Sequence, residues 1–282
     1  MPFALIQHII AFFYLLTGSI SDLRKREVAD WSNYGLIAMG IFFHAVLSVW
    51  LLDVQYIARS LIGLGVFWII ALAFYYSGQW GGGDAKMLMG IGALYGLGWE
   101  YSHNRFLFGF FFNMLIAGAA YGICFSVYLA FRNRSAFQKE YRRLSMIPLF
   151  HWMKIILLAG LFAAVVLSFF GLDLILLGIP AFFAFLLYLG LFIKSVEKST
   201  MYRNLPVSKL TEGDWVAKEI HHNGKYICGP KDLGLSKKQI AKLKRLKRKT
   251  ILVKEGIPFV PSFFLGWILN LFFGNLLLNI FA

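Results

Sequence analysis

Long apolar runs, separated by short polar segments, recur along most of this chain. They cover residues 2–20, 33–52, 56–77, 84–99, 105–131, 151–171, 173–194 and 258–281. A helix needs about 20 mostly apolar residues to cross a hydrocarbon core about 30 Å thick. The pattern therefore predicts an all-α polytopic membrane protein with about eight transmembrane helices. Seven is the alternative, because the break at residues 171–173 is brief and the run 84–99 is short.

The first run predicts a retained helix rather than a signal peptide. No basic segment precedes it and no small-residue cleavage site follows it. Composition agrees with a membrane protein, since 59% of the 282 residues are hydrophobic and only 15% are charged. Soluble domains carry about 25% charged residues, so a soluble enzyme is excluded. The two cysteines form no C-x-x-C pair, which indicates neither a zinc site nor a disulfide framework.

Basic residues fix the expected orientation. The chain has 28 Lys and Arg against 14 Asp and Glu, a formal net charge of +14. With the N-terminus outside, 25 of those 28 basic residues fall on one side of the predicted helices, as the positive-inside rule requires of the cytosolic side. We therefore expect a multi-pass protein of the cell membrane with both termini outside. The charge excess then reflects topology, and we expect no nucleic-acid partner.

The composition becomes polar between residues 195 and 256, which predicts a small cytosolic α+β insertion. The expected organisation is a membrane core over 1–194, this basic insertion over 195–256, and a last transmembrane helix over 257–282 that completes the core. The Asn223-Gly224 step predicts a type I′ hairpin. Ser236 and Gln239 have the spacing of a capping box, which predicts a helix through about Lys249.

The predicted helix of the insertion carries an apolar stripe. Ile240, Leu243 and Leu246 recur at three-residue spacing among lysines and arginines. One interpretation is an amphipathic helix lying on anionic lipid. The other is a solvated helix whose stripe packs on its own small domain.

Two carboxylates are the strongest functional candidates. Asp22 ends the first run and Asp84 begins the fourth, so the predicted orientation places both at the cytosolic face. Ionisable residues in membrane helices are functional candidates by default. Two nearby carboxylates can share one proton, and the ionised one can then activate water while the other polarises a carbonyl. That is aspartic-protease chemistry, and we expect it to need no metal or cofactor.

Three glycines, Gly81, Gly82 and Gly83, stand before Asp84. Glycine permits backbone conformations closed to other residues and leaves room for another chain to approach. Such clearance suits a peptide bond placed beside a catalytic carboxylate. The alternative is a flexible turn in which Asp84 only caps the next helix.

These residues resemble the signature of a known family. Gly81, Gly83 and Asp84 match the G-x-G-D motif of membrane aspartyl proteases. The stretch beginning at Asp22 resembles the first catalytic segment of the type IV prepilin peptidases, with Asp30 in the position that usually holds Asn. It departs from the family where Ala29 replaces a frequent Pro.

A third segment strengthens the resemblance to the archaeal branch, the preflagellin peptidases. Residues 256–261, which include Pro258 and Pro261, look like the piece of that branch that opens the last helix. The resemblance implies an aspartic endopeptidase that removes the short basic leader from archaellin or pilin-like precursors at the cytosolic face. The cysteine-bearing extension of the bacterial enzymes has no counterpart between the first two helices, so we expect no methyltransferase activity.

Further residues have competing interpretations. Lys86 either supports the active-site loop or extends toward the interface. Glu27 and Asp30 either attract a basic leader or balance the neighbouring arginines. Pro258 and Pro261 either contact substrate or only initiate the last helix.

Three other functions are alternatives to the peptidase. A presenilin-like intramembrane protease shares the G-x-G-D signature, but Arg24, Lys25 and Arg26 follow Asp22 closely and favour the membrane surface. A small-solute transporter predicts repeats or several charges at mid-depth, and neither is evident. An interaction protein with a membrane anchor would not need a glycine turn that faces a second aspartate.

Overall fold

The computed structural model describes residues 2–99, 101–169, 175–246 and 248–276. These residues form ten α-helices: α1 (Pro2–Lys25), α2 (Asp30–Trp50), α3 (Gln55–Tyr76), α4 (Gly82–Tyr95), α5 (Tyr101–Arg132), α6 (Arg134–Ser145), α7 (Pro148–Phe169), α8 (Ile175–Thr200), α9 (Lys237–Arg245) and α10 (Val260–Phe273). Five strands accompany them: β1 (Tyr202–Pro206), β2 (Trp215–Val216), β3 (Ile220–His222), β4 (Lys225–Cys228) and β5 (Thr250–Lys254). The prediction of a helical polytopic protein with an α+β insertion is confirmed.

Six of the described helices are long and apolar enough to cross a membrane, namely α1, α2, α3, α5, α7 and α8. The predicted fourth and last spans appear as α4 and α10, each with 14 described residues. The break at 171–173 and the end of the last run lie outside the described residues. The choice between seven and eight spans therefore stays a prediction.

The chain divides into two compact units. One contains residues 1–123, 205–251 and 255–282, and the other contains residues 124–204 and 252–254. Helix α5 belongs to the first unit up to Ile123 and to the second beyond it. The organisation expected from composition, with boundaries at 194 and 256, stays a prediction.

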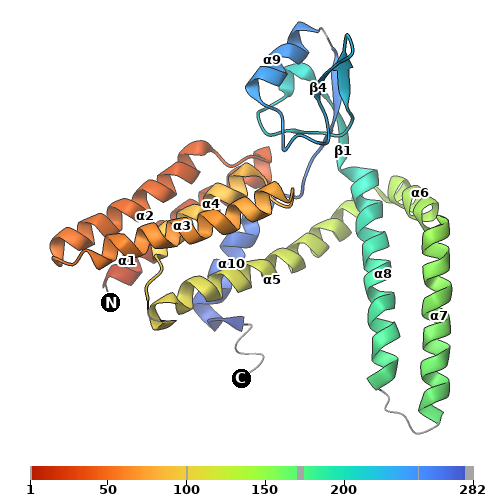
Figure 1. Ribbon diagram of the computed structural model, residues 1–282, viewed down its shortest axis with the longest axis horizontal. Coiled ribbons are helices and arrows are strands. Elements are labelled where there is room, and N and C mark those ends of the chain that lie inside the picture. Colours follow the sequence, from red (N-terminus) through yellow and green to blue (C-terminus); the bar gives the residue numbers. More distant parts are fainter. Residues whose placement is uncertain (1, 100, 170–174, 247, 277–282) are drawn as a thin grey trace. The chain divides into compact units, whose positions relative to one another are not determined.

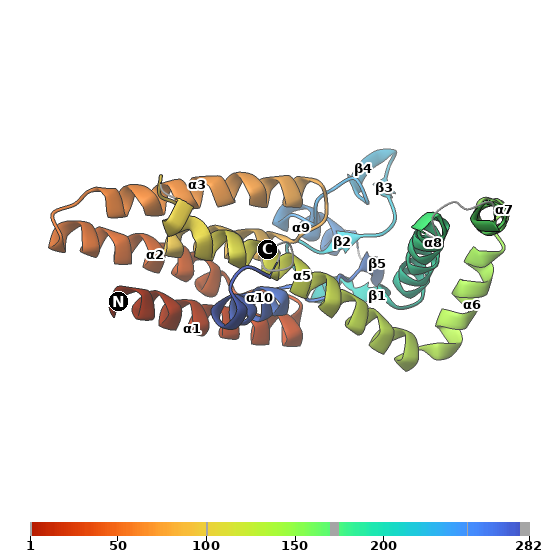
Figure 2. The same cartoon turned by 90° about the horizontal axis from the view of Figure 1, so that it is seen from below.

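Helix α4 packs against α2 and α3 in the first unit (Figures 1 and 2). Its sequence after the first turn is apolar on every side, and a helix of that kind is normally buried. Met87, Leu88, Ile91 and Leu94 are all fully buried in the hydrophobic core of this unit. Because the hydrophobic core holds α4 in place, it also holds Asp84, which lies in the first turn of α4.

Polar side chains from three other helices bind the carbonyls at the end of α4. The Ser60 hydroxyl donates to the Ala93 carbonyl at 2.7 Å. The Gln7 amide donates to the Leu94 carbonyl at 2.8 Å, and His44 Nε2 lies 3.0 Å from the same oxygen. The last carbonyls of a helix have no partner within it, and an apolar core offers no water to replace one. These contacts allow a short helix to end inside the bundle.

The insertion contains the hairpin that the sequence predicts. Strands β3 and β4 pair antiparallel, and the turn residues Asn223 and Gly224 have φ values of 49° and 74°. Such positive values at both central positions are those of a type I′ turn. The remaining strands form a sheet in the order β1-β5-β2.

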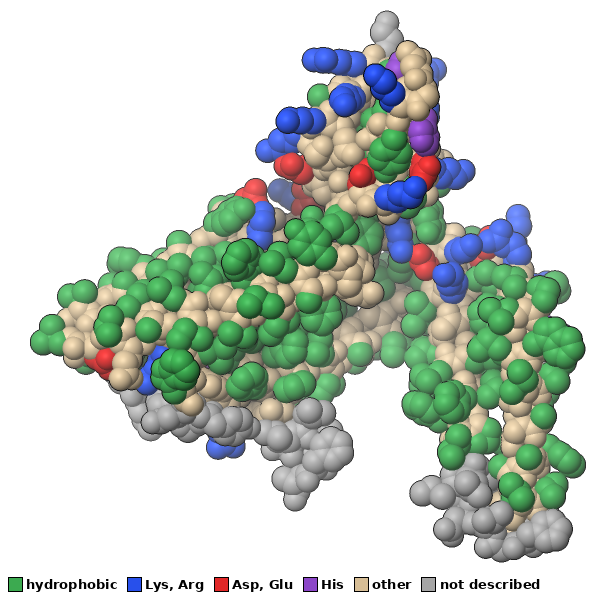
Figure 3. All heavy atoms as spheres, in the orientation of Figure 1, with side chains coloured by type: hydrophobic (Ala, Val, Ile, Leu, Met, Phe, Trp, Pro, Cys, Tyr) green, Lys and Arg blue, Asp and Glu red, His purple; other side chains and the backbone are tan. Residues whose placement is uncertain are grey.

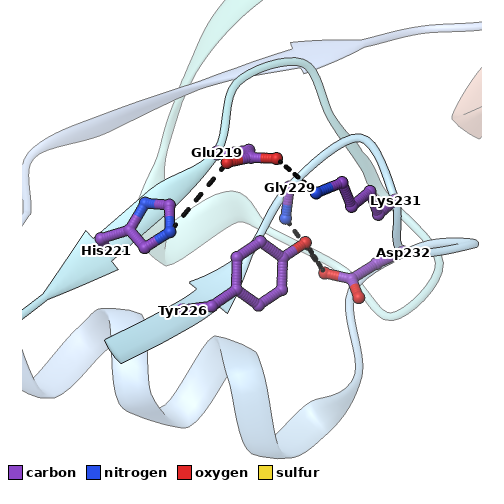
Figure 4. A network of polar contacts seen from close by, with 6 residues as sticks. All are labelled: Glu219, His221, Tyr226, Gly229, Lys231 and Asp232. Atoms are coloured by element: carbon purple, nitrogen blue, oxygen red, sulfur yellow. Dashed lines mark hydrogen bonds and ion pairs between the residues drawn. The ribbon is translucent and has the colours of Figure 1, made fainter. Parts of the chain in front are cut away.

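Asp232 binds the hairpin to the loop that follows it (Figure 4). Its Oδ2 accepts hydrogen bonds from the Tyr226 hydroxyl and the Gly229 amide, both at 3.0 Å. Beside it, Glu219 forms an ion pair with Lys231 at 3.2 Å. These contacts give the small insertion a defined shape despite its modest core.

Helix α9 begins at the predicted capping box. The Gln239 amide donates to the Ser236 hydroxyl, and the Gln239 side chain accepts from the Ser236 amide. The helix ends at Arg245, earlier than expected, because β5 begins at Thr250. Ile240 and Leu243 are buried, which favours packing on the insertion over contact with lipid. Figure 3 shows that Lys and Arg side chains gather on the surface of the insertion.

The second unit consists mainly of α6, α7 and α8, of which α8 packs against both of the others. The polar segment between the apolar runs 105–131 and 151–171 was expected to be a loop. Residues 134–145 instead form α6, whose Phe137 ring meets that of Phe192 on α8. An amphipathic pattern dominated by basic residues concealed this helix.

Candidate active site

Asp22 lies in the last turns of α1 and is 6% exposed. Its Oδ2 accepts a hydrogen bond of 3.0 Å from the Val260 amide. Val260 is the first residue of α10, where the amide has no partner within the helix. A carboxylate is favoured there, because the amides at a helix N-terminus carry partial positive charge. The start of the last helix therefore holds the first aspartate in place.

The turn after Asp22 is tied to the approach to α10. Arg26 has a φ of 60°, and its amide donates to the Asp22 carbonyl at 2.9 Å. Its guanidinium donates to the Gly256 carbonyl, also at 2.9 Å. Together with the Asp22–Val260 bond, this contact joins segments more than 200 residues apart.

Asp84 is the third residue of α4 and therefore lies in its first turn. Its Oδ2 accepts a hydrogen bond of 3.0 Å from the amide of Gly81, the residue that precedes α4. Asp84 therefore contacts the helix N-terminus from the third helical position and is not itself the N-cap residue. This hydrogen bond involves one of the two carboxylate oxygens, so it is compatible with catalysis.

Gly83 permits a close approach between α4 and the turn before α2. A Cβ atom at this position would lie 3.1 Å from Val28 Cγ2 and 3.2 Å from Val28 Cβ. At Gly82 the nearest atom would be Tyr75 Cε2 at 4.0 Å. The requirement for glycine is thus steric and specific to Gly83.

Asp84 is surrounded so that its neutral form is favoured. Burial and the negative charge of Asp22 together raise the pKa of Asp84 to about 7, against the opposing hydrogen bond from Gly81. Asp84 lies in α4, outside the six helices long enough to cross a membrane. The negative charge of Asp22 is thus the second cause, after burial, that favours the neutral form of Asp84.

Both aspartates line one cavity of about 830 Å³, a size typical of ligand sites. The lining comes from the end of α1, the second half of α3 and the N-terminal parts of α2 and α4. The insertion contributes loop residues and the first residue of α9. Its residues outside the insertion are Ser21, Asp22, Lys25, Arg26, Glu27, Val28, Ala29, Asp30, Asn33, Trp68, Ala71, Leu72, Tyr75, Gly81, Gly82, Gly83, Asp84, Ala85, Lys86 and Met89. The insertion adds Thr211, Glu212, Gly213, Asp214, Trp215, Leu233 and Lys237.

Three charged residues that the sequence indicated as candidates, Glu27, Asp30 and Lys86, line this cavity. Lys86 forms an ion pair of 2.9 Å with Asp30, and its Nζ lies 4.6 Å from the centre of the Tyr34 ring. Lys86 thus contacts two residues of α2, Asp30 and Tyr34.

Pro258 and Pro261 have a different place. Both are buried at the start of α10, and neither is among the described residues that line the cavity. They precede and follow Val260 closely, so they shape the helix start that binds Asp22. Their suggested contact with substrate stays a prediction.

Sequence reasoning missed two parts of the site. Asn33 escaped notice because it stands inside an apolar run without a partner motif. The loop from Thr211 to Trp215 escaped notice because no local pattern connects it with residues 130 to 190 positions earlier. An acidic pair, Glu212 and Asp214, flanking a glycine was the one local signal.

A second cavity of similar volume lies between α7 and α8. It is lined entirely by apolar residues and glycine, from Phe150 to Gly190, and offers no group for acid–base chemistry. Across the described residues, no cluster of three or more His, Cys, Asp or Glu side chains is arranged to hold a metal ion.

Comparison with known families finds a match in the part of the chain that contains both aspartates. Residues 9–123 match the model of the type IV leader peptidase family. This region of the chain is therefore similar to that family. It includes Asp22, Asp84 and the glycines before Asp84, whereas Pro258 and Pro261 lie outside the matched residues.

Part of this chain is also similar to curated preflagellin peptidases. The protein of Methanococcus maripaludis is 37% identical over 90 residues, which cover 32% of this chain and 39% of that relative. The proteins of Methanocaldococcus jannaschii and Methanococcus voltae are 33% and 32% identical over 90 residues, each covering 32% of this chain and 38% of the relative. The chain thus spans less than two fifths of the length of these relatives. No solved structure matches it.

Proposed function

We propose that this protein is a membrane-embedded aspartic endopeptidase that removes a short basic leader from archaellin or type IV pilin-like precursors. The observation that carries the proposal is the cavity that Asp22 and Asp84 line together. Both aspartates lie within residues 9–123, which match the leader peptidase family model. Relatives that bear the name preflagellin peptidase support the substrate class.

The surroundings of the two aspartates suggest a division of roles. Asp84 is buried and favours its neutral form, so it would donate its proton to the carbonyl oxygen of the scissile bond. Asp22, which accepts the Val260 amide, would be the ionised partner and take a proton from the attacking water. The water oxygen then bonds to the carbonyl carbon. As the tetrahedral intermediate collapses, the C–N bond breaks and the departing nitrogen takes the proton from Asp22. One hydroxyl of the intermediate returns its proton to Asp84, which restores the starting state of the pair.

The cavity also suits a basic leader. Besides the aspartate pair it is lined by Glu27 and Asp30, and the insertion adds Glu212 and Asp214. Basic side chains compensate part of this charge. Lys25 and Arg26 also line the cavity, Lys86 pairs with Asp30, and Lys237 pairs with Glu212 at 3.4 Å. A lysine or arginine of a leader would compete for these exposed carboxylates, which favours its approach by charge attraction.

We place the site at the cytosolic face of a multi-pass protein with both termini outside. Arg24, Lys25 and Arg26 end α1 beside Asp22, and basic residues are characteristic of the cytosolic ends of helices. The same residues would favour anionic lipid headgroups at that face. Cleavage would then occur at a peptide bond just before the substrate's hydrophobic segment.

The direct test is cleavage of a purified archaellin or pilin-like precursor by the protein in detergent or vesicles. The proposal predicts a single product whose new N-terminus, read by mass spectrometry, directly follows the leader. A precursor whose leader lysines and arginines are replaced by glutamine is the matched control, and its KM should be about 3- to 10-fold higher. Failure to cut any basic-leader precursor would refute the proposal.

A further inference from the structure

Asn33 is a buried polar residue at the cavity of the two aspartates. It lies in the first turn of α2, three residues after Asp30, and is 1% exposed. It lines the same cavity as Asp22 and Asp84. Residues three apart lie on the same face of a helix, so this face of α2 presents both Asp30 and Asn33 toward the site.

The carboxamide of Asn33 has no hydrogen-bond partner among the described residues, at either Oδ1 or Nδ2. The Ser32 and Ser262 hydroxyls of this unit also have no partner among the described residues, whereas other buried side chains do. Ser60 binds the Ala93 carbonyl, and Ser19 binds the Leu15 carbonyl at 2.6 Å. Burial of an unpaired amide is unfavourable, and most buried polar side chains in proteins are hydrogen-bonded. An unpaired amide at the wall of a cavity therefore indicates a group that binds there.

We propose, on the basis of the peptidase function above, that the Asn33 carboxamide binds the main chain of the substrate beside the bond that is cut. A carboxamide carries one acceptor and two donor hydrogens on a planar group, so it complements the C=O and N–H groups of a peptide. Binding of this kind is independent of the substrate's side chains. It would hold an extended chain in one register relative to Asp22 and Asp84.

The neighbouring residue provides a matched comparison. Ser32 is also 1% exposed, and its hydroxyl also has no partner among the described residues. It does not, however, belong to the described lining of the cavity. Lack of a partner is therefore common to both residues, and the position at the cavity distinguishes Asn33.

The test compares Asn33→Leu, which has similar size, with Ser32→Ala in the full-length protein. The proposal predicts that Asn33→Leu lowers kcat/KM for a precursor about tenfold. It also predicts that thermal unfolding occurs at the same or a higher temperature, because an unpaired amide is no longer buried. Ser32→Ala should leave cleavage unchanged. A parallel loss of activity and stability in Asn33→Leu would indicate a structural role and overturn the proposal.

Synthetic precursors locate the contact. In each one, a single backbone amide near the cut is replaced by an ester, which removes one N–H donor. The proposal predicts that the tenfold loss of Asn33→Leu shrinks for one ester position next to the cut. An equal loss at every position would overturn it, since Asn33 would then act on water or on the fold.

The outcomes separate this inference from the function on which it rests. If the wild type cuts a precursor and Asn33→Leu cuts it equally well, the role of Asn33 is refuted and the peptidase function stands. If the wild type cuts none, both are refuted.

Discussion

At the scale of single residues, the cavity depends on the small size of Gly83 and on the burial of Asp84. Gly83 lets the turn around Val28 approach α4 closely. Asp84 is then enclosed near Asp22, whose charge opposes its ionisation. Close packing and the protonation state of the pair are consequences of the same local geometry.

Gly83→Ala tests the packing. The added methyl group would lie 3.1 Å from Val28 Cγ2, so the turn or the helix must shift. Overpacking of this kind costs about 1–3 kcal/mol of stability, and a displaced Asp84 should lower kcat by about tenfold or more. Thermal unfolding and cleavage rate measure the two effects.

Two variants serve as controls for Gly83→Ala. Gly82→Ala meets no atom closer than 4.0 Å and should be tolerated. The double variant Gly83→Ala with Val28→Ala removes the clash and should recover part of the activity. Equal effects of Gly82→Ala and Gly83→Ala would show that the contact with Val28 is unimportant.

The protonation of Asp84 predicts the pH dependence of cleavage. Its pKa of about 7 means that the proton is present below that pH and is lost above it. If Asp84 is the proton donor, kcat/KM should fall as pH rises through about 7. A profile measured with a precursor that does not titrate in this range tests the point, and a constant rate up to pH 9 would contradict it.

Stability should vary in the same pH range. The unfolded chain has the ordinary Asp pKa of 3.8, whereas the folded value is raised to about 7. Between these values the folded state binds more protons, so the wild type should lose stability with rising pH relative to Asp84→Asn. Unfolding temperatures of both proteins at pH 4, 6 and 8 give the comparison. A difference that stays constant with pH would contradict the raised pKa.

At the scale of elements, the site depends on a short helix that ends inside the bundle. The carbonyls at the end of α4 are bound by Ser60, Gln7 and His44. These partners come from three helices, so they anchor the C-terminal end of α4. The position of Asp84 at the other end therefore depends on contacts far from the cavity.

Ser60→Ala tests this anchoring. It leaves the Ala93 carbonyl without its hydroxyl donor in a fully buried place. We expect a loss of about 1 kcal/mol in stability, with cleavage at low temperature largely retained because the cavity is untouched. Ser77→Ala, which removes an exposed hydroxyl bound to the Phe74 carbonyl, is the control and should change stability by less than about 0.5 kcal/mol. Equal stability of the two variants would contradict the anchoring role.

Elements with a local cause were predictable from sequence. The hairpin at Asn223-Gly224 and the capping box of α9 follow from a few adjacent residues, and both are confirmed. Helix α6 was missed because its amphipathic pattern is dominated by charge and resembles that of a loop. The exact end of α9 was missed because it is determined by the strand that follows.

At the scale of the molecule, the cavity is assembled from segments far apart in the chain. Residues 22 and 84 were recognisable from a short signature, and the alternation of apolar runs predicted that both lie at the same end of the helices. The hydrogen bond from Val260 to Asp22 and the insertion loop from Thr211 to Trp215 were not predictable. Long-range contacts of this kind depend on how complete elements pack, and no local pattern encodes them.

The most direct test of the aspartate pair uses Asp22→Asn and Asp84→Asn at matched expression in membranes, with Asp53→Asn as control. Asp53 caps the start of α3 through a bond to the Gln55 amide, far along the chain from the cavity lining. We expect each of the first two variants to lose cleavage of a basic-leader precursor by at least about 1,000-fold while remaining in the membrane, and Asp53→Asn to cut at the wild-type rate. Wild-type cleavage by either Asp22→Asn or Asp84→Asn would contradict the proposed mechanism.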